Sequence, residues 1–111
     1  MTPSKPASTN AEKPKLSALI RRGAEMVEGQ FFGIGYGQLS NPDNKLRVCA
    51  MGAAYVAVFG NVPVLGSPQM EREVIRLTGV TEDVVTDVIS MNDGSHMTFN
   101  QIIAALEARG L

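Results

Sequence analysis

Two side chains in this sequence are of the types that serve as nucleophile and base. Cys49 is the only cysteine and His96 the only histidine, and a thiol beside an imidazole supports covalent catalysis when the two meet in space. Asp93 is a third candidate. The small and apolar residues that follow Cys49 instead predict a buried thiol with a raised pKa. His96 lies in a polar turn, which favours a surface or capping role, so the sequence predicts no catalytic residue.

Metal-ligating residues are too few for a structural zinc site. Such a site needs about four Cys or His ligands, and the chain has one of each. Its C-terminal half carries several carboxylates, which are expected on solvated helix faces: Glu71, Glu73, Glu82, Asp83 and Asp87. The sequence therefore predicts neither a metal nor a cofactor.

Alternating glycines in residues 33–37 resemble a phosphate-binding loop. That motif needs a strand before it and a helix directly after it, whereas residues 38–45 have turn chemistry. A Gly-rich reversal or flap is the simpler interpretation. It carries Phe31, Phe32 and Tyr36, and exposed aromatic side chains there would mark a binding surface.

Residues 74–89 have the outline of a helix-turn-helix, with a short helix, a glycine turn and a capped second helix. The second helix would present Glu82, Asp83 and Asp87, which repel phosphates. The segment is therefore interpreted as a packing unit. Binding of nucleic acid would instead use the N-terminal tail and four basic residues outside the segment: Arg21, Arg22, Lys45 and Arg47.

Five segments have apolar residues at helical spacing between capping or breaking residues. The predicted helices run from Leu16 to Gly29, 46–59, Ser67 to Gly79, Thr81 to Ile89, and Thr98 to Gly110. Asn92 to Ser95 is predicted to break the chain between the last two. The fold class is an all-α bundle of four to five short helices, with a Gly-rich loop or small hairpin after the first.

The predicted helix over 46–59 is apolar on most sides, which is typical of a buried, central helix. Gly52 and Ala53 would let another helix approach closely. Asn92 and Asp93 would bond nearby backbone groups before the last helix. These four residues are therefore assigned structural roles.

Composition indicates one small domain over 16–111 behind a disordered tail over 1–15, because the tail has no large apolar residue after Met1. The formal net charge is −1, so the whole molecule is not attracted to nucleic acid or anionic membranes. A single cysteine excludes an intrachain disulfide and favours the cytoplasm. The longest apolar stretch, Val48 to Gly60, is too short for a bilayer, which predicts no membrane span.

Several short motifs resemble those of a group of uncharacterised bacterial and phage proteins with LSxxIRxGA, CALGAA, IxxLND and TxxQIADW elements. The matching residues here are Leu16-Ser17, Ile20-Arg21 and Gly23-Ala24, Cys49 to Ala54, Ile89 with Met91-Asn92-Asp93, and Thr98 with Gln101-Ile102. The resemblance covers residues 15–107 and implies a small helical scaffold without indicating an activity. Some members have an additional Cys pair that suggests metal; Val64 to Glu73 stands there in this chain.

The leading functional prediction is a non-enzymatic protein–protein interaction module, because no convergent set of titratable groups is evident. The expected partner is another protein, and a homo-oligomer is compatible with the sequence. One alternative is a nucleic-acid-associated regulator with the helix-turn-helix-like unit. The other is a thiol enzyme that uses Cys49.

Overall fold

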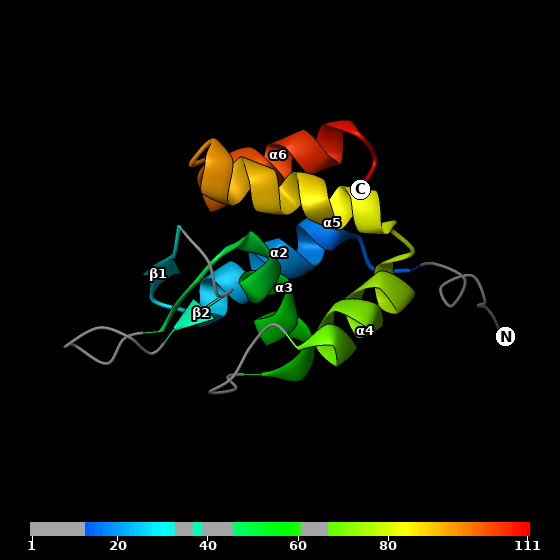
Figure 1. Cartoon of the computed structure of the whole chain (residues 1–111), viewed down its shortest axis with the longest axis horizontal. Helices are drawn as coiled ribbons and strands as arrows, with labels where there is room; N and C mark the ends of the chain where they lie inside the picture. The colour runs from blue at the N-terminus through cyan, green and yellow to red at the C-terminus, as the bar shows by residue number, and fades with distance from the viewer. Residues whose placement is uncertain (1–12, 33–36, 39–45, 61–66) are drawn as a thin grey trace, which may run out of the picture.

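The computed structural model describes residues 13–32, 37–38, 46–60 and 67–111. These residues form five α-helices, one π-helix and three two-residue strands (Figure 1). The helices are α2 (Leu16–Met26), α3 (Ala50–Phe59), α4 (Pro68–Thr78), α5 (Glu82–Ile89), η1 (Ser90–Gly94, the π-helix) and α6 (Phe99–Ala108). The predicted all-α fold class is confirmed. Most of the predicted tail, residues 1–12, lies outside the described residues.

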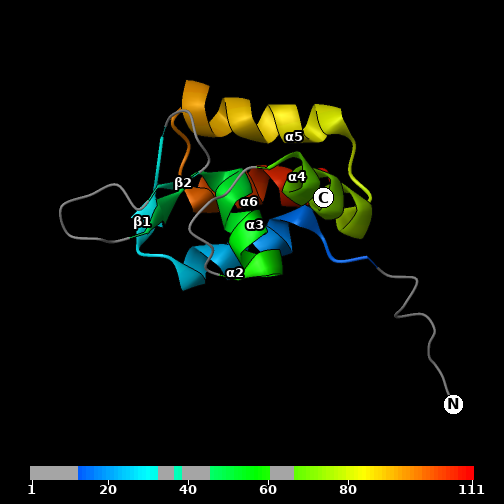
Figure 2. The same cartoon turned by 60° about the horizontal axis from the view of Figure 1, so that its bottom comes forward.

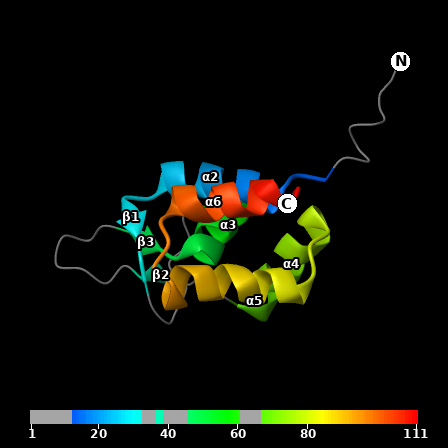
Figure 3. The same ribbon diagram turned by 90° about the horizontal axis from the view of Figure 1, so that it is seen from above.

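Helix α3 lies at the centre of the bundle. It packs against α2 on one side and contacts α4 and α5 on others, and Figure 2 shows it between α2 and α5. Every residue from Ala50 to Val56 is buried, as its almost wholly apolar sequence predicts. Figure 3 shows α6 beside α2, which completes the layer on that side.

The close packing of α2 on α3 depends on a glycine. A Cβ atom at Gly23 would lie 1.7 Å from the carbonyl oxygen of Ala53, far inside any van der Waals contact. The backbones of the two helices therefore meet at Gly23, and only a residue without a side chain fits there.

Caps define the starts of three helices as the sequence predicts. The side chains of Ser67 and Thr81 each accept a hydrogen bond from the backbone N–H three residues later. Thr98 and Gln101 form a capping box, with bonds of 3.2 and 2.9 Å. At the other end of α4, Gly79 closes the helix in the left-handed conformation, with φ of 77°, which glycine adopts at little cost.

The predicted helix over 46–59 begins later than expected. Arg47–Val48 forms strand β3, Cys49 is the N-cap, and α3 begins at Ala50. Val48 is β-branched and suits a strand, and β3 is paired on both sides. The sequence did not predict this change from strand to helix, because a continuous apolar run has no periodicity that separates a buried strand from a buried helix.

The partners of β3 come from the segment after α2. Strand β1 (Gly29–Gln30) pairs with β3 in parallel, and β2 (Gly37–Gln38) pairs with it in antiparallel fashion. The strand order is β1-β3-β2. The region after the first helix therefore adds its strands to either side of the residues before α3.

The predicted chain break at Asn92 to Ser95 begins too early, because the residues up to Gly94 are helical. Helix α5 continues directly into η1, where the N–H of Ser95 donates to the carbonyl of Ser90 at 3.0 Å. The Asn92 side chain lies inside the fold, where it is completely buried and makes four hydrogen bonds. The change of direction comes instead at His96, whose φ is 51°.

Candidate functional site

The Asn92 side chain is the centre of a polar network inside a predominantly apolar core. Its Oδ1 accepts hydrogen bonds from Gln30 Nε2 at 2.8 Å and from the N–H of Ala50 at 3.0 Å. Its Nδ2 donates to the carbonyl of Phe31 at 2.9 Å and to Asp93 Oδ1 at 2.7 Å. The amide thus makes all four of the hydrogen bonds that it can form. These bonds offset the cost of burying a polar group completely.

Gln30 extends this network to the start of α6. Its Nε2 also donates to the carbonyl of Met97 at 2.7 Å, and its Oε1 accepts from the N–H of Phe99 at 2.8 Å. Sequence reasoning missed Gln30, because it stands in a stretch that has turn chemistry and gives no periodic signal. Its position opposite Val48 in the sheet places it one residue from Cys49 across the strands.

The Cys49 thiol lies beside this network and is buried, with 4 % of its surface exposed. Its Sγ accepts a hydrogen bond from the N–H of Gly52 at 3.3 Å, which caps α3. Burial raises the pKa of Cys49 to about 11, and the negative charge of Asp93 adds to the rise, while backbone N–H groups oppose it. The thiol is therefore protonated at neutral pH and is a poor nucleophile.

His96 contacts an aromatic ring near the network. The rings of His96 and Phe32 meet edge to face, with centroids 5.3 Å apart and planes at 84°. This is a favoured geometry for two aromatic rings. His96 is exposed and Phe32 is 41 % exposed, so the pair, here termed the aromatic patch, faces solvent.

The structure thus brings Cys49, Asn92 and Asp93 together, with Asp93 half-buried. Phe31, a predicted binding residue, is also half-buried and contributes its carbonyl to the network. Tyr36, another predicted binding residue, lies outside the described residues.

The predicted basic residues that the structure describes lie on two elements, Arg21 and Arg22 on α2 and Arg47 in β3. Arg21 on α2 pairs with Glu107 on α6 at 3.0 Å, and Arg22 is exposed. Arg47 is half-buried in β3, and Lys45 lies outside the described residues. The pairing of Arg21 neutralises its charge locally and does not favour a contact with phosphates.

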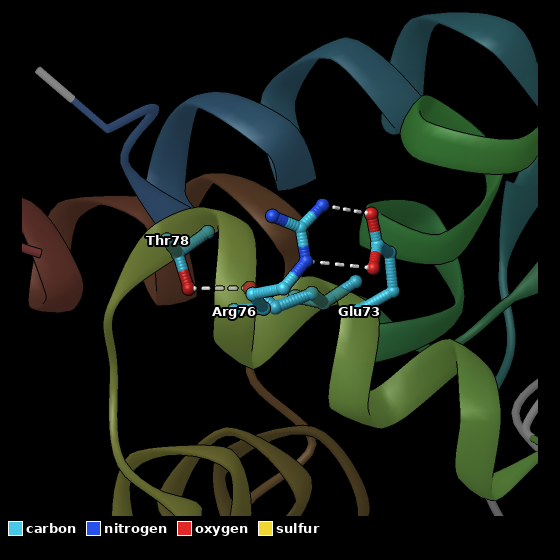
Figure 4. A network of polar contacts seen from close by, with 4 residues as sticks. Glu73, Arg76 and Thr78 are labelled. Atoms are coloured by element: carbon cyan, nitrogen blue, oxygen red, sulfur yellow. Dashed lines mark hydrogen bonds and ion pairs between the residues drawn. The ribbon is translucent and has the colours of Figure 1, made fainter. Parts of the chain in front are cut away.

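Two acidic residues, Glu73 on α4 and Asp87 on α5, form ion pairs on the protein surface. Glu73 pairs with Arg76 through two hydrogen bonds, and Thr78 Oγ1 donates to the Val74 carbonyl at 2.7 Å (Figure 4). The guanidinium of Arg76 lowers the pKa of Glu73. Asp87 on α5 pairs with Arg109 at 3.1 Å. Exposed ion pairs of this kind stabilise a fold only slightly.

Glu82 and Asp83 occupy the first turn of α5, and both are exposed. The helix that a helix-turn-helix would insert into DNA therefore begins with two carboxylates. Their position suits the positive end of the helix dipole, which is a structural role.

Neither a metal cluster nor a membrane span is present within the described ranges. No group of three or more His, Cys, Asp or Glu side chains is placed there to hold a metal ion. None of the helices in those ranges has the length and apolar character needed to cross a membrane.

No family model, curated protein or solved structure matches this chain. The resemblance over residues 15–107 stays a prediction.

Proposed function

We propose that this chain is a non-enzymatic protein–protein interaction module that binds its partner through the aromatic patch, Phe32 and His96. The catalytic candidate Cys49 supports a structural role instead, because it is buried and protonated. The neighbouring Asn92 uses its whole hydrogen-bonding capacity within the fold.

The observation that carries the proposal is the exposed Phe32 ring held against His96. An aromatic side chain that is both exposed and fixed is typical of the anchors that dominate binding energy at protein interfaces. Its large apolar surface can be buried by a partner with little loss of side-chain entropy, because the ring has only two rotatable bonds.

The backbone before Phe32 is anchored as well. The N–H of Phe31 donates to the Val48 carbonyl at 2.7 Å, and the carbonyl of Phe31 accepts from Asn92. The segment is therefore already ordered in the free protein, which reduces the entropy that is lost when a partner binds.

The test compares three alanine variants that each remove one exposed apolar side chain. Phe32 is 41 % exposed, and Met26 and Phe59 are 39 % and 40 % exposed on α2 and α3. Tagged wild type, Phe32→Ala, Met26→Ala and Phe59→Ala proteins are used to capture proteins from the native cell. Captured partners are quantified by mass spectrometry, and the affinity of each purified partner is then measured by calorimetry.

We expect one partner whose affinity falls by at least about tenfold with Phe32→Ala, as for an interface anchor, and by much less with the two controls. Equal binding by all four proteins would move the interface away from the aromatic patch. Repeated capture without any specific partner would contradict the interaction module itself.

A further inference from the structure

Two short segments contribute few fully buried side chains, although Val27, Met91 and Met97 pack partly buried against the core. None of the residues from Val27 to Phe32 is buried, and Asn92 is the only buried residue between Ile89 and Thr98. In contrast, α2, α3 and α6 each bury several apolar side chains. Segments with few buried apolar contacts open at a lower free energy than the core around them.

The bonds that hold these segments converge on one side chain. Asn92 in η1 connects Gln30 and Phe31, at the end of β1, with the N–H of Ala50, at the start of α3. Removing this amide takes one bond from each of the three, while Phe31 keeps its N–H bond to Val48 and Gln30 keeps its bonds to Met97 and Phe99. Hydrogen bonds that share one group form and break cooperatively.

Cys49 lies where the two segments meet. It follows Val48, which pairs with Gln30 in the sheet, and it precedes Ala50, which bonds to Asn92. Asp93 in η1 is close enough for its charge to act on the thiol. Separation of β1 and η1 from this point would expose Cys49 to solvent.

We propose that Asn92 is a latch. When it releases, Gly29–Phe32 and η1 move away from the start of α3 and uncover the Cys49 thiol, while α2, α3 and α6 stay packed. This local opening is a property of the free chain. The test of the latch is therefore independent of the test for a binding partner.

The experiment measures the reaction of Cys49 with Ellman's reagent in the full chain at about pH 8, over a urea series. The thiolate attacks the reagent's disulfide and forms a mixed disulfide, and one thionitrobenzoate is released and detected by its absorbance. Global unfolding is measured on the same samples by circular dichroism. Labelling through global unfolding alone depends on urea with the full unfolding slope, whereas labelling through a local opening depends on it weakly.

At low urea we expect a nearly urea-independent labelling rate that exceeds the rate expected from global unfolding by at least about tenfold. Asn92→Ala is expected to raise this rate by about tenfold or more beyond the factor set by its loss of global stability, because the buried bonds are lost. Asn100→Ala, on the exposed side of α6, is the control and leaves the rate unchanged.

Labelling that follows the full unfolding slope down to the lowest urea concentration would overturn the latch. So would an Asn92→Ala rate explained entirely by reduced global stability. If Asn92→Ala does not fold, Gln30→Ala replaces it, because it removes one of the two donors to Asn92 Oδ1 together with the bonds from Gln30 to Met97 and Phe99. The wild-type urea series can overturn the latch without any variant, because it tests the local opening on which the latch depends.

Discussion

A buried amide and a buried thiol at the start of α3 illustrate how side-chain environment determines chemistry. Asn92 is stable in the core because protein groups replace the hydrogen bonds that water would supply. Cys49 is inert for the opposite reason, since the protein offers its thiolate too little stabilisation to offset the lost solvation. The burial of Cys49 should therefore be detectable in how the unfolding free energy depends on pH.

Because the pKa of Cys49 rises from its ordinary 9.0 to about 11 on folding, the protonated thiol contributes stability below about pH 9. Above that pH the unfolded chain loses the proton first, so stability falls as pH rises toward 11. The loss approaches roughly 2–3 kcal/mol, at about 1.4 kcal/mol per pKa unit. Urea unfolding of wild type at a series of pH values measures it.

Cys49→Ser is the matched control, because a hydroxyl can also accept the bond from Gly52 but does not titrate in this range. Other groups that ionise at high pH contribute equally to both proteins. The difference in unfolding free energy between wild type and Cys49→Ser should therefore shrink or reverse between pH 9 and 11. A constant difference would mean that the thiol is solvated in the native state.

The close contact between α2 and α3 predicts that a side chain at Gly23 destabilises the fold. In Gly23→Ala the new methyl group would lie 1.7 Å from the Ala53 carbonyl oxygen, so one helix must move away from the other. We expect a loss of roughly 3 kcal/mol or more, measured by chemical denaturation. A Cβ atom at Gly94 would meet no other atom within 4 Å, so the control Gly94→Ala should change stability by less than about 1 kcal/mol.

The capping box of α6 makes a second prediction about the elements. Thr98→Ala removes the acceptor for the N–H of Gln101 and should lower the free energy of unfolding by about 1 kcal/mol. Thr86→Ala, at an exposed position inside α5, should leave stability unchanged or slightly higher, since alanine is the better helix former. A loss of equal size in both variants would indicate that the cap adds no stability.

Elements that begin with a capping residue were predictable from the sequence, whereas elements that depend on distant partners were not. Ser67, Thr81 and Thr98 act on their own neighbours, so the starts of α4, α5 and α6 follow from spacing alone. β3 forms because Val48 finds partners distant in the chain, and Gln30 joins Asn92 across 62 positions. Such contacts depend on tertiary packing, which apolar periodicity does not encode.

At the scale of the whole molecule, the buried side chains of all five α-helices form one connected core, with Tyr55 among its largest members. A single core of this size favours cooperative, two-state unfolding. We expect the thermal midpoints from far-ultraviolet circular dichroism and from tyrosine signals to coincide. Midpoints several degrees apart would show that part of the bundle melts separately.

The antiparallel arrangement of α2 and α6 also separates the molecule into two poles. Lys15 Nζ and the N–H of Ser17 bond to the carbonyls of Gly110 and Leu111 at 3.1 Å, whereas the aromatic patch follows β1 and precedes α6 at the other end. The 11 residues of α2 span about 16 Å between them. A tether or surface attached beside Lys15 or Leu111 would therefore leave the aromatic patch pointing outward, where a second macromolecule can reach it.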